Sequence, residues 1–115
     1  MPRESKSYDL VSDAALYSLG RLGARLREAR LRRNWTQAET GEKAGLSDSS
    51  VKKVEAGSAR ITIGAYLSLL DVFGVPTAFN SVLKAGEDTL GEALSRSSLR
   101  QRARQSATVE EDWEI

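Results

Sequence analysis

Apolar residues recur at helical spacing in several short segments that glycines and prolines separate. One segment places Leu22, Leu26 and Ala29 three and four positions apart. A later segment, Ile63 to Phe73, is apolar over a wide face. No stretch shows the strict alternation of apolar and polar residues that is typical of a half-buried strand. The pattern therefore predicts an all-α fold.

The first predicted helix follows Ser12 or Asp13, because either side chain can cap the first turn. It ends near Asn34. Gly20 and Gly23 lower the helix propensity of this segment, so we expect a break near Gly20. The arginine-rich face of the second part is either solvated or lies along a phosphate backbone.

Two short helices with clear boundaries come next. Thr36 and Glu39 form a Thr-x-x-Glu capping box, which predicts a helix over residues 37–44. Gly45 suits a left-handed turn after that helix. Ser47 can cap a second helix of about two turns, which Gly57 ends.

The second of these helices divides cleanly into an inner and an outer face. Val51 and Val54 point inward at helical spacing. The outward residues are polar: Ser47, Asp48, Ser49, Lys52 and Lys53. A duplex major groove admits one α-helix, and a reading helix presents short polar residues at its first turn. The pattern therefore predicts a helix-turn-helix that binds DNA.

The remainder predicts a core-closing helix capped by Thr62, a short fifth helix near Phe79 that Thr77 could cap, and a last helix over Thr89 to about Gln105. Four regions follow from this pattern. They are a flexible N-terminal arm (1–11), a helix-turn-helix domain (12–85), a C-terminal helical extension (86–105) and an acidic tail (106–115).

The charge is unevenly distributed. The chain of 115 residues has a net charge of +1, but residues 20–60 hold ten basic and five acidic residues. A basic region within a nearly neutral chain is typical of a nucleic-acid-binding surface. Arg60, in the loop after the second short helix, joins the candidate DNA-binding residues.

Several classes of function are disfavoured. The chain has no cysteine and no histidine, which excludes disulfides, the usual zinc sites and histidine-based catalysis. The sequence has no glycine-rich phosphate loop and no pair of carboxylates placed on one rigid face. We therefore expect no enzyme activity, no metal and no cofactor. No apolar run is long enough to span a membrane, and no signal peptide follows Met1. We expect a cytoplasmic protein.

Residues from about Leu19 to Pro76 resemble the XRE family of phage-repressor-like helix-turn-helix regulators. The matching landmarks are Thr36-Gln37-x-Glu39, Gly45-Leu46-Ser47, Val51, Val54-Glu55-x-Gly57 and Leu67-x-x-Leu70-x-x-Phe73-Gly74-Val75. The resemblance implies a compact five-helix domain, to which this chain adds the C-terminal helix. It also implies double-stranded operator DNA as a ligand and a homodimer as the working form.

The resemblance implies roles for single residues. Gln37 would contact a phosphate from its helix N-terminus, while Ser49 and Lys53 would face base edges, with Lys52 close by. Asp48 would either accept a hydrogen bond from a cytosine amino group or only stabilise its helix. Arg30 and Glu55 occupy positions where the family often holds a buried ion pair. Departures from the family at Thr40, Gly41 and Ala44 predict a more thinly packed second helix.

The C-terminal part is similar to HipB-like antitoxins, which bind operator DNA together with HipA-type serine/threonine kinase toxins and repress their own operon. The similarity is carried by Leu90-Gly-Glu-Ala-Leu94, by Leu99-Arg-Gln-Arg-Ala-Arg104 and by an acidic end with a tryptophan. Trp113 and Ile115 would anchor a docking peptide. Alternatively the tail is disordered, or it folds back on the basic face. A phage-type regulator without a toxin and a protein-interaction module remain the other candidate functions.

Overall fold

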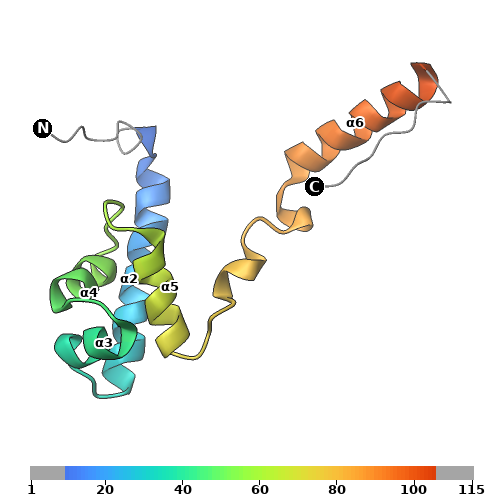
Figure 1. Ribbon diagram of the computed structural model, residues 1–115. Helices are drawn as coiled ribbons and strands as arrows, with labels where there is room; N and C mark the ends of the chain where they lie inside the picture. The colour runs from blue at the N-terminus through green and yellow to red at the C-terminus, as the bar shows by residue number, and fades with distance from the viewer. Residues whose placement is uncertain (1–9, 106–115) are drawn as a thin grey trace, which may run out of the picture. The chain divides into compact units, whose positions relative to one another are not determined.

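The computed structural model describes residues 10–105, and within them the chain is all-helical, with no strand. Two compact units divide between Ala78 and Phe79. The described part of the first unit includes the α-helices that Figure 1 labels α2 (Asp13–Arg32), α3 (Gln37–Ala44), α4 (Asp48–Glu55) and α5 (Ile63–Val72). These bounds confirm the predicted all-α helix-turn-helix fold.

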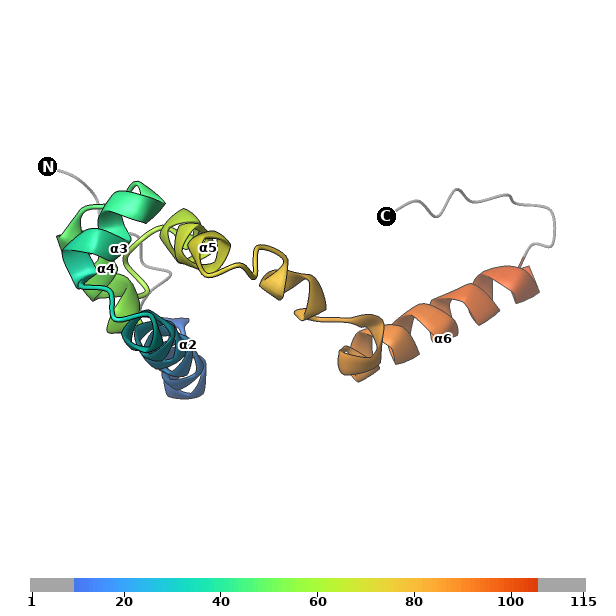
Figure 2. The same ribbon diagram turned by 90° about the horizontal axis from the view of Figure 1, so that it is seen from below.

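Among its described residues, the second unit includes a 3₁₀ turn and one long helix. The short 3₁₀ segment η2 (Ala85–Glu87) precedes α6 (Thr89–Gln105), which is continuous in both views (Figures 1 and 2). Asp88 caps α6, because its Oδ1 accepts a hydrogen bond from the backbone N–H of Gly91 at 3.2 Å. Among the described residues no helix is long and apolar enough to cross a membrane.

The core of the first unit is built around α4, which packs against α2, α3 and α5. Val51 and Val54 of α4 are fully buried, with 0 % of their surface exposed. The other buried apolar side chains are Leu26, Ala65, Tyr66, Leu69, Leu70 and Phe73. The predicted reading helix is therefore held by three neighbours, and its orientation follows from the packing of its two valines.

The expected break in the first helix is wrong, since α2 runs unbroken through both glycines. Gly23 allows close packing at this point. A Cβ atom on Gly23 would lie 2.5 Å from the backbone oxygen of Val54 and 2.8 Å from that of Glu55. On the other side of this contact, a Cβ on Gly57 would lie 2.5 Å from the Cα of Gly20. Without side chains at these positions, α2 and the end of α4 meet backbone to backbone.

In α3 the residues that depart from the family pattern have specific contacts. Thr40 is fully buried, and its hydroxyl donates a hydrogen bond to the backbone oxygen of Thr36 at 2.9 Å. A Cβ on Gly41 would clash with the backbone oxygen of Leu46, and Leu46 donates its N–H to Gly41 at 2.8 Å. Gly41 therefore allows the turn after α3 to close onto the helix.

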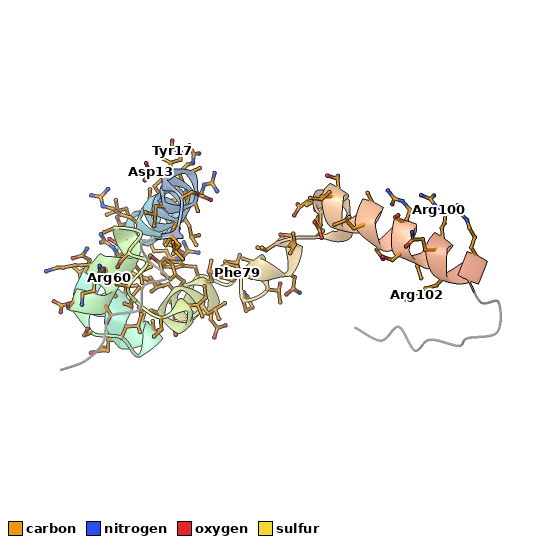
Figure 3. The ribbon with its side chains drawn as sticks, turned by 90° about the horizontal axis from the view of Figure 1, so that it is seen from above. Asp13, Tyr17, Arg60, Phe79, Arg100 and Arg102 are labelled. Atoms are coloured by element: carbon orange, nitrogen blue, oxygen red, sulfur yellow. The ribbon has the colours of Figure 1, made fainter. Side chains whose placement is uncertain are left out.

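The expected fifth helix is a single 3₁₀ turn, η1 (Ala78–Ser81). Leu83 has a left-handed backbone with φ of 60°, which ends any helical continuation. Figure 3 labels Phe79, which is half-buried, whereas Val82 and Leu83 are 64 % and 68 % exposed.

We predict opposite effects for two glycine-to-alanine changes in α2. Gly23→Ala should lower the free energy of unfolding by about 2 kcal/mol, because the new methyl group meets backbone atoms that cannot move aside. Gly20→Ala is the matched control. It places its Cβ in open space, so the gain in helix propensity should stabilise the protein by up to about 1 kcal/mol. Urea unfolding measures both, and equal effects would disprove the close-packing role of Gly23.

Candidate nucleic-acid interface

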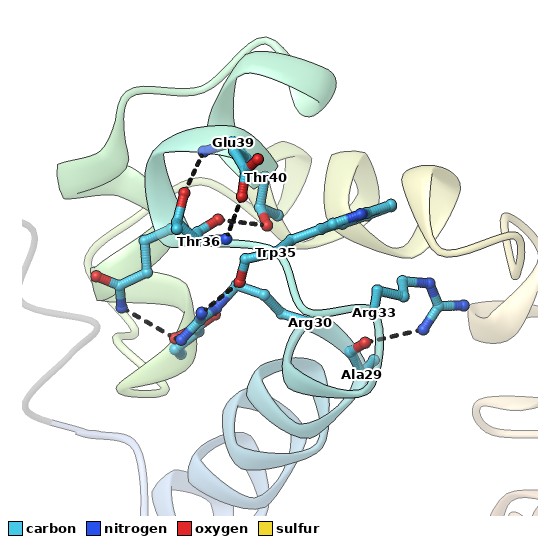
Figure 4. A network of polar contacts seen from close by, with 9 residues as sticks. Ala29, Arg30, Arg33, Trp35, Thr36, Glu39 and Thr40 are labelled. Atoms are coloured by element: carbon cyan, nitrogen blue, oxygen red, sulfur yellow. Dashed lines mark hydrogen bonds and ion pairs between the residues drawn. The ribbon is translucent and has the colours of Figure 1, made fainter.

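A buried ion pair joins α2 to α4 beneath the candidate interface. Arg30 Nε lies 2.6 Å from Glu55 Oε2, and Arg30 NH2 donates to Glu55 Oε1 at 3.1 Å. The two side chains are only 9 % and 5 % exposed. The third guanidinium nitrogen, NH1, donates to the backbone oxygen of Trp35 at 2.9 Å (Figure 4). The predicted ion pair is confirmed, and Arg30 is architectural.

Gln37 shares the same carboxylate. Its Nε2 donates to Glu55 Oε1 at 3.0 Å, so the side-chain amide of the first α3 residue is held by the last residue of α4. The side chain of Gln37 therefore fixes α3 against α4. This contact was not predicted from the sequence. The backbone N–H of Gln37 lies in the first turn of α3, where amides have no acceptor within the helix.

The N-terminus of α3 is reinforced by the predicted capping box, which the structure confirms. The backbone N–H of Thr36 donates to Glu39 Oε1 at 2.7 Å, and the N–H of Glu39 donates to the Thr36 hydroxyl at 3.0 Å (Figure 4). The hydrogen bond from the Thr36 backbone lowers the pKa of the Glu39 carboxyl below its ordinary value. Glu39 is thus held as a carboxylate.

The outer face of α4 is formed by the predicted polar residues. Ser47 is the N-cap of α4, and its Oγ accepts from the backbone N–H of Ser50 at 3.0 Å. The exposed residues at this end and along the outer face are those of the predicted set: Ser47, Asp48, Ser49, Lys52 and Lys53. Asp48 is the first residue of α4, where its charge favours the helix dipole. This position is compatible with both roles that the sequence left open for it.

The loop after α4 carries Arg60, which is exposed (Figure 3). Its backbone N–H donates to the Ser58 hydroxyl at 3.1 Å. From α5, the hydroxyl of Tyr66 donates to the backbone oxygen of Ser58 at 2.6 Å, and burial raises the pKa of that hydroxyl. The loop that bears Arg60 is therefore tied to the core.

A stack of aromatic and cationic side chains, also not predicted, braces the C-terminal end of α2. The rings of Trp35 and Phe73 stack with centroids 5.9 Å apart. The Lys43 ammonium lies 4.8 Å from the Trp35 ring centre, and the Arg33 guanidinium lies 4.9 Å from that of Phe73. Arg33 also donates to the backbone oxygens of Ala29 at 2.9 Å and Phe73 at 3.2 Å. Two of the basic residues thus serve packing.

The structure brings most of the predicted site together on the first unit. Gln37, the outer face of α4 and Arg60 belong to consecutive segments of that unit. The other predicted binding residues, Trp113 and Ile115, lie outside the described residues.

We predict that Glu55→Gln destabilises the fold by about 3 kcal/mol, because it leaves the buried Arg30 guanidinium without a counter-charge. Glu28→Gln is the matched control. It removes the acid of the Glu28–Arg32 pair, whose side chains are 61 % and 70 % exposed, and should cost less than about 0.5 kcal/mol. Urea unfolding at neutral pH gives both values. Similar losses in the two variants would contradict the central role of the buried pair.

Comparison with known proteins agrees with this geometry. The family described as "Helix-turn-helix domain" matches residues 21–78, about half of the chain. The match contains Arg30, Glu55 and every predicted DNA-binding residue. No curated protein matches the sequence significantly. The chain belongs to the helix-turn-helix domain family and carries the DNA-binding domain of a regulator of that kind.

Proposed function

We propose that this protein is a sequence-specific transcriptional repressor that reads its operator with α4. The observation that carries the proposal is that this short helix has one buried apolar face and one exposed polar face. Val51 and Val54 are completely buried, while the polar side chains at and after Ser47 are exposed. A helix anchored through one face and polar on the other can enter a major groove without disturbing the core.

The chemistry of the exposed residues suggests how the operator is read. Lys53 can donate to the O6 and N7 atoms of guanine, and the Ser49 hydroxyl can pair with several base edges. Asp48 can accept from a cytosine amino group. The backbone N–H of Gln37 would bind a phosphate at the N-terminus of α3. Lys52 and Arg60 would add further contacts, and phosphate contacts fix the register of the protein on the duplex.

We further propose that the working form is a homodimer. An eight-residue reading helix offers few base contacts, and proteins with this motif commonly pair on half-sites about one helical turn apart. Candidate residues for the dimer surface are exposed leucines and a valine: Val82, Leu83, Leu90 and Leu94 are 60–70 % exposed. Such apolar exposure is typical of surfaces that bind another protein.

The narrower role that we propose is that of antitoxin and autorepressor in a HipA-type toxin–antitoxin operon. Its support is the order of sequence features after Val75, namely the leucine-bearing segment, the arginine-rich segment and the acidic end with Trp113. Apolar anchors among acids suit a pocket with a basic rim. A stand-alone regulator without a toxin partner and a protein-interaction module are the alternatives.

We predict that Lys53→Ala reduces the preference for duplex DNA from upstream of the protein's own gene, relative to a shuffled duplex, about 10- to 100-fold. Lys84→Ala is the matched control, because it removes the same charge from an exposed position in the second unit and should leave this preference unchanged. Fluorescence anisotropy measures both. Equal preference in wild type and Lys53→Ala would remove α4 as the reading helix.

For the antitoxin role, the decisive variant is a deletion of residues 108–115. It should weaken binding to the kinase encoded beside this gene, while the affinity for upstream DNA stays within about twofold, because the predicted DNA-binding residues are untouched. Trp113→Ala, which keeps every acidic residue, should reproduce the loss. Calorimetric titration gives the affinities. A neighbouring gene that encodes no kinase, or unchanged kinase binding, argues for the stand-alone regulator.

A further inference from the structure

Three arginines form a stripe along one side of α6. Arg96, Arg100 and Arg104 are four residues apart, so successive guanidinium groups originate about 6 Å apart along the helix axis. All three side chains are exposed. Figure 3 shows Arg100 and Arg102 on opposite sides of α6, so the fourth arginine of the helix does not belong to the stripe.

Arg100 and Arg104 have no acid one turn away within the helix, and only Arg96 has one at that spacing. The only acidic residue of α6 is Glu92, one turn before Arg96, and its Oε2 is buried with no hydrogen-bond partner among the described residues. In α2, by contrast, the exposed Arg32 is paired with Glu28 one turn earlier at 3.7 Å. Like charges four residues apart on one helix face repel each other and destabilise the helix. An anionic partner would offset this repulsion by binding the arginines.

We propose that the stripe formed by Arg96, Arg100 and Arg104 is a second DNA-binding surface, which binds the phosphate backbone of the duplex read by α4. The inference rests on the proposed function, because it takes that duplex as the partner. The basic residues of α6 are all arginines, with no lysine among them. Guanidinium groups match phosphate oxygens with two parallel hydrogen bonds, which a lysine ammonium cannot provide.

This surface would add affinity without sequence preference. Phosphate contacts carry no base information, so α6 would strengthen binding to operator and unrelated DNA alike. Its covalent link to the helix-turn-helix unit makes this second contact intramolecular once α4 is bound, so it gains from a high effective concentration. Base readout would then depend on the first unit, and a large part of the salt-dependent affinity on the second.

The test compares full-length variants by their salt dependence. Each phosphate contact contributes about 0.9 to the slope of log affinity against log salt concentration, so Arg96→Gln/Arg100→Gln/Arg104→Gln should reduce the slope by about 2.7 per protomer. Between 50 and 200 mM salt, wild type should therefore lose about 40-fold more affinity than this triple variant. The loss of slope should be the same on upstream and shuffled duplexes.

The matched pair Arg100→Gln and Arg102→Gln separates the stripe from general charge. Both remove one positive charge from α6, and glutamine keeps the helix propensity of arginine, which circular dichroism verifies. Arg100→Gln should reduce the slope by about 0.9, and Arg102→Gln should leave it unchanged. Equal effects of the two changes would overturn the stripe as the binding surface.

The remaining outcomes distinguish this inference from the proposed function. If wild type prefers its upstream DNA but the triple variant keeps the full slope, the stripe is not a DNA surface. In another outcome, the triple variant shows a reduced salt slope while Lys53→Ala keeps the full preference for upstream DNA. In that case the stripe binds DNA, and only the proposed base reading by α4 is wrong.

Discussion

The helix-turn-helix depends on one buried carboxylate. Glu55 accepts hydrogen bonds from Arg30 and from Gln37, while Arg30 also donates to the backbone oxygen of Trp35. These contacts tie together the end of α2, the start of α3 and the end of α4. Removing either charge would leave its partner buried and unpaired, which strongly destabilises a fold. By contrast, an intact buried ion pair stabilises a fold little, if at all, relative to apolar residues of similar volume. The pair is therefore better understood as fixing the arrangement of three helices than as a large net source of stability.

Close backbone packing supplies the second constraint on α4. Gly23 of α2 allows the backbone at the end of α4 to approach it directly, and Gly41 allows the turn after α3 to close. These glycines lower helix propensity. However, because they have no side chain, they allow α4 to pack closely against its neighbours. Because α4 has only two inward valines, its position depends on these close approaches as well as on its own apolar burial.

Local signals in the sequence predicted the parts of this fold that local interactions decide. The bounds of α3, its capping box and the caps at Ser47 and Gly45 depend on residues at most four positions apart, and they were correct. The Gln37–Glu55 contact joins residues 18 positions apart, and the stack of Trp35 on Phe73 joins residues 38 positions apart. No local pattern encodes such contacts. The continuity of α2 is not predicted for the same reason, because helix propensity contains no information on the residues that Gly23 packs against.

The structure also changes the functional interpretation of the basic residues. Counting ten of them in residues 20–60 suggests one broad phosphate-binding face. Arg30 is instead buried in the ion pair, and the exposed side chains of Arg33 and Lys43 lie over aromatic rings. The first unit then offers fewer cations to a duplex than its composition implies. Affinity for DNA depends on the number of phosphates neutralised, so under the proposed function additional phosphate contacts would strengthen operator binding. In our proposal the exposed arginines of α6, covalently linked to this domain, supply such contacts.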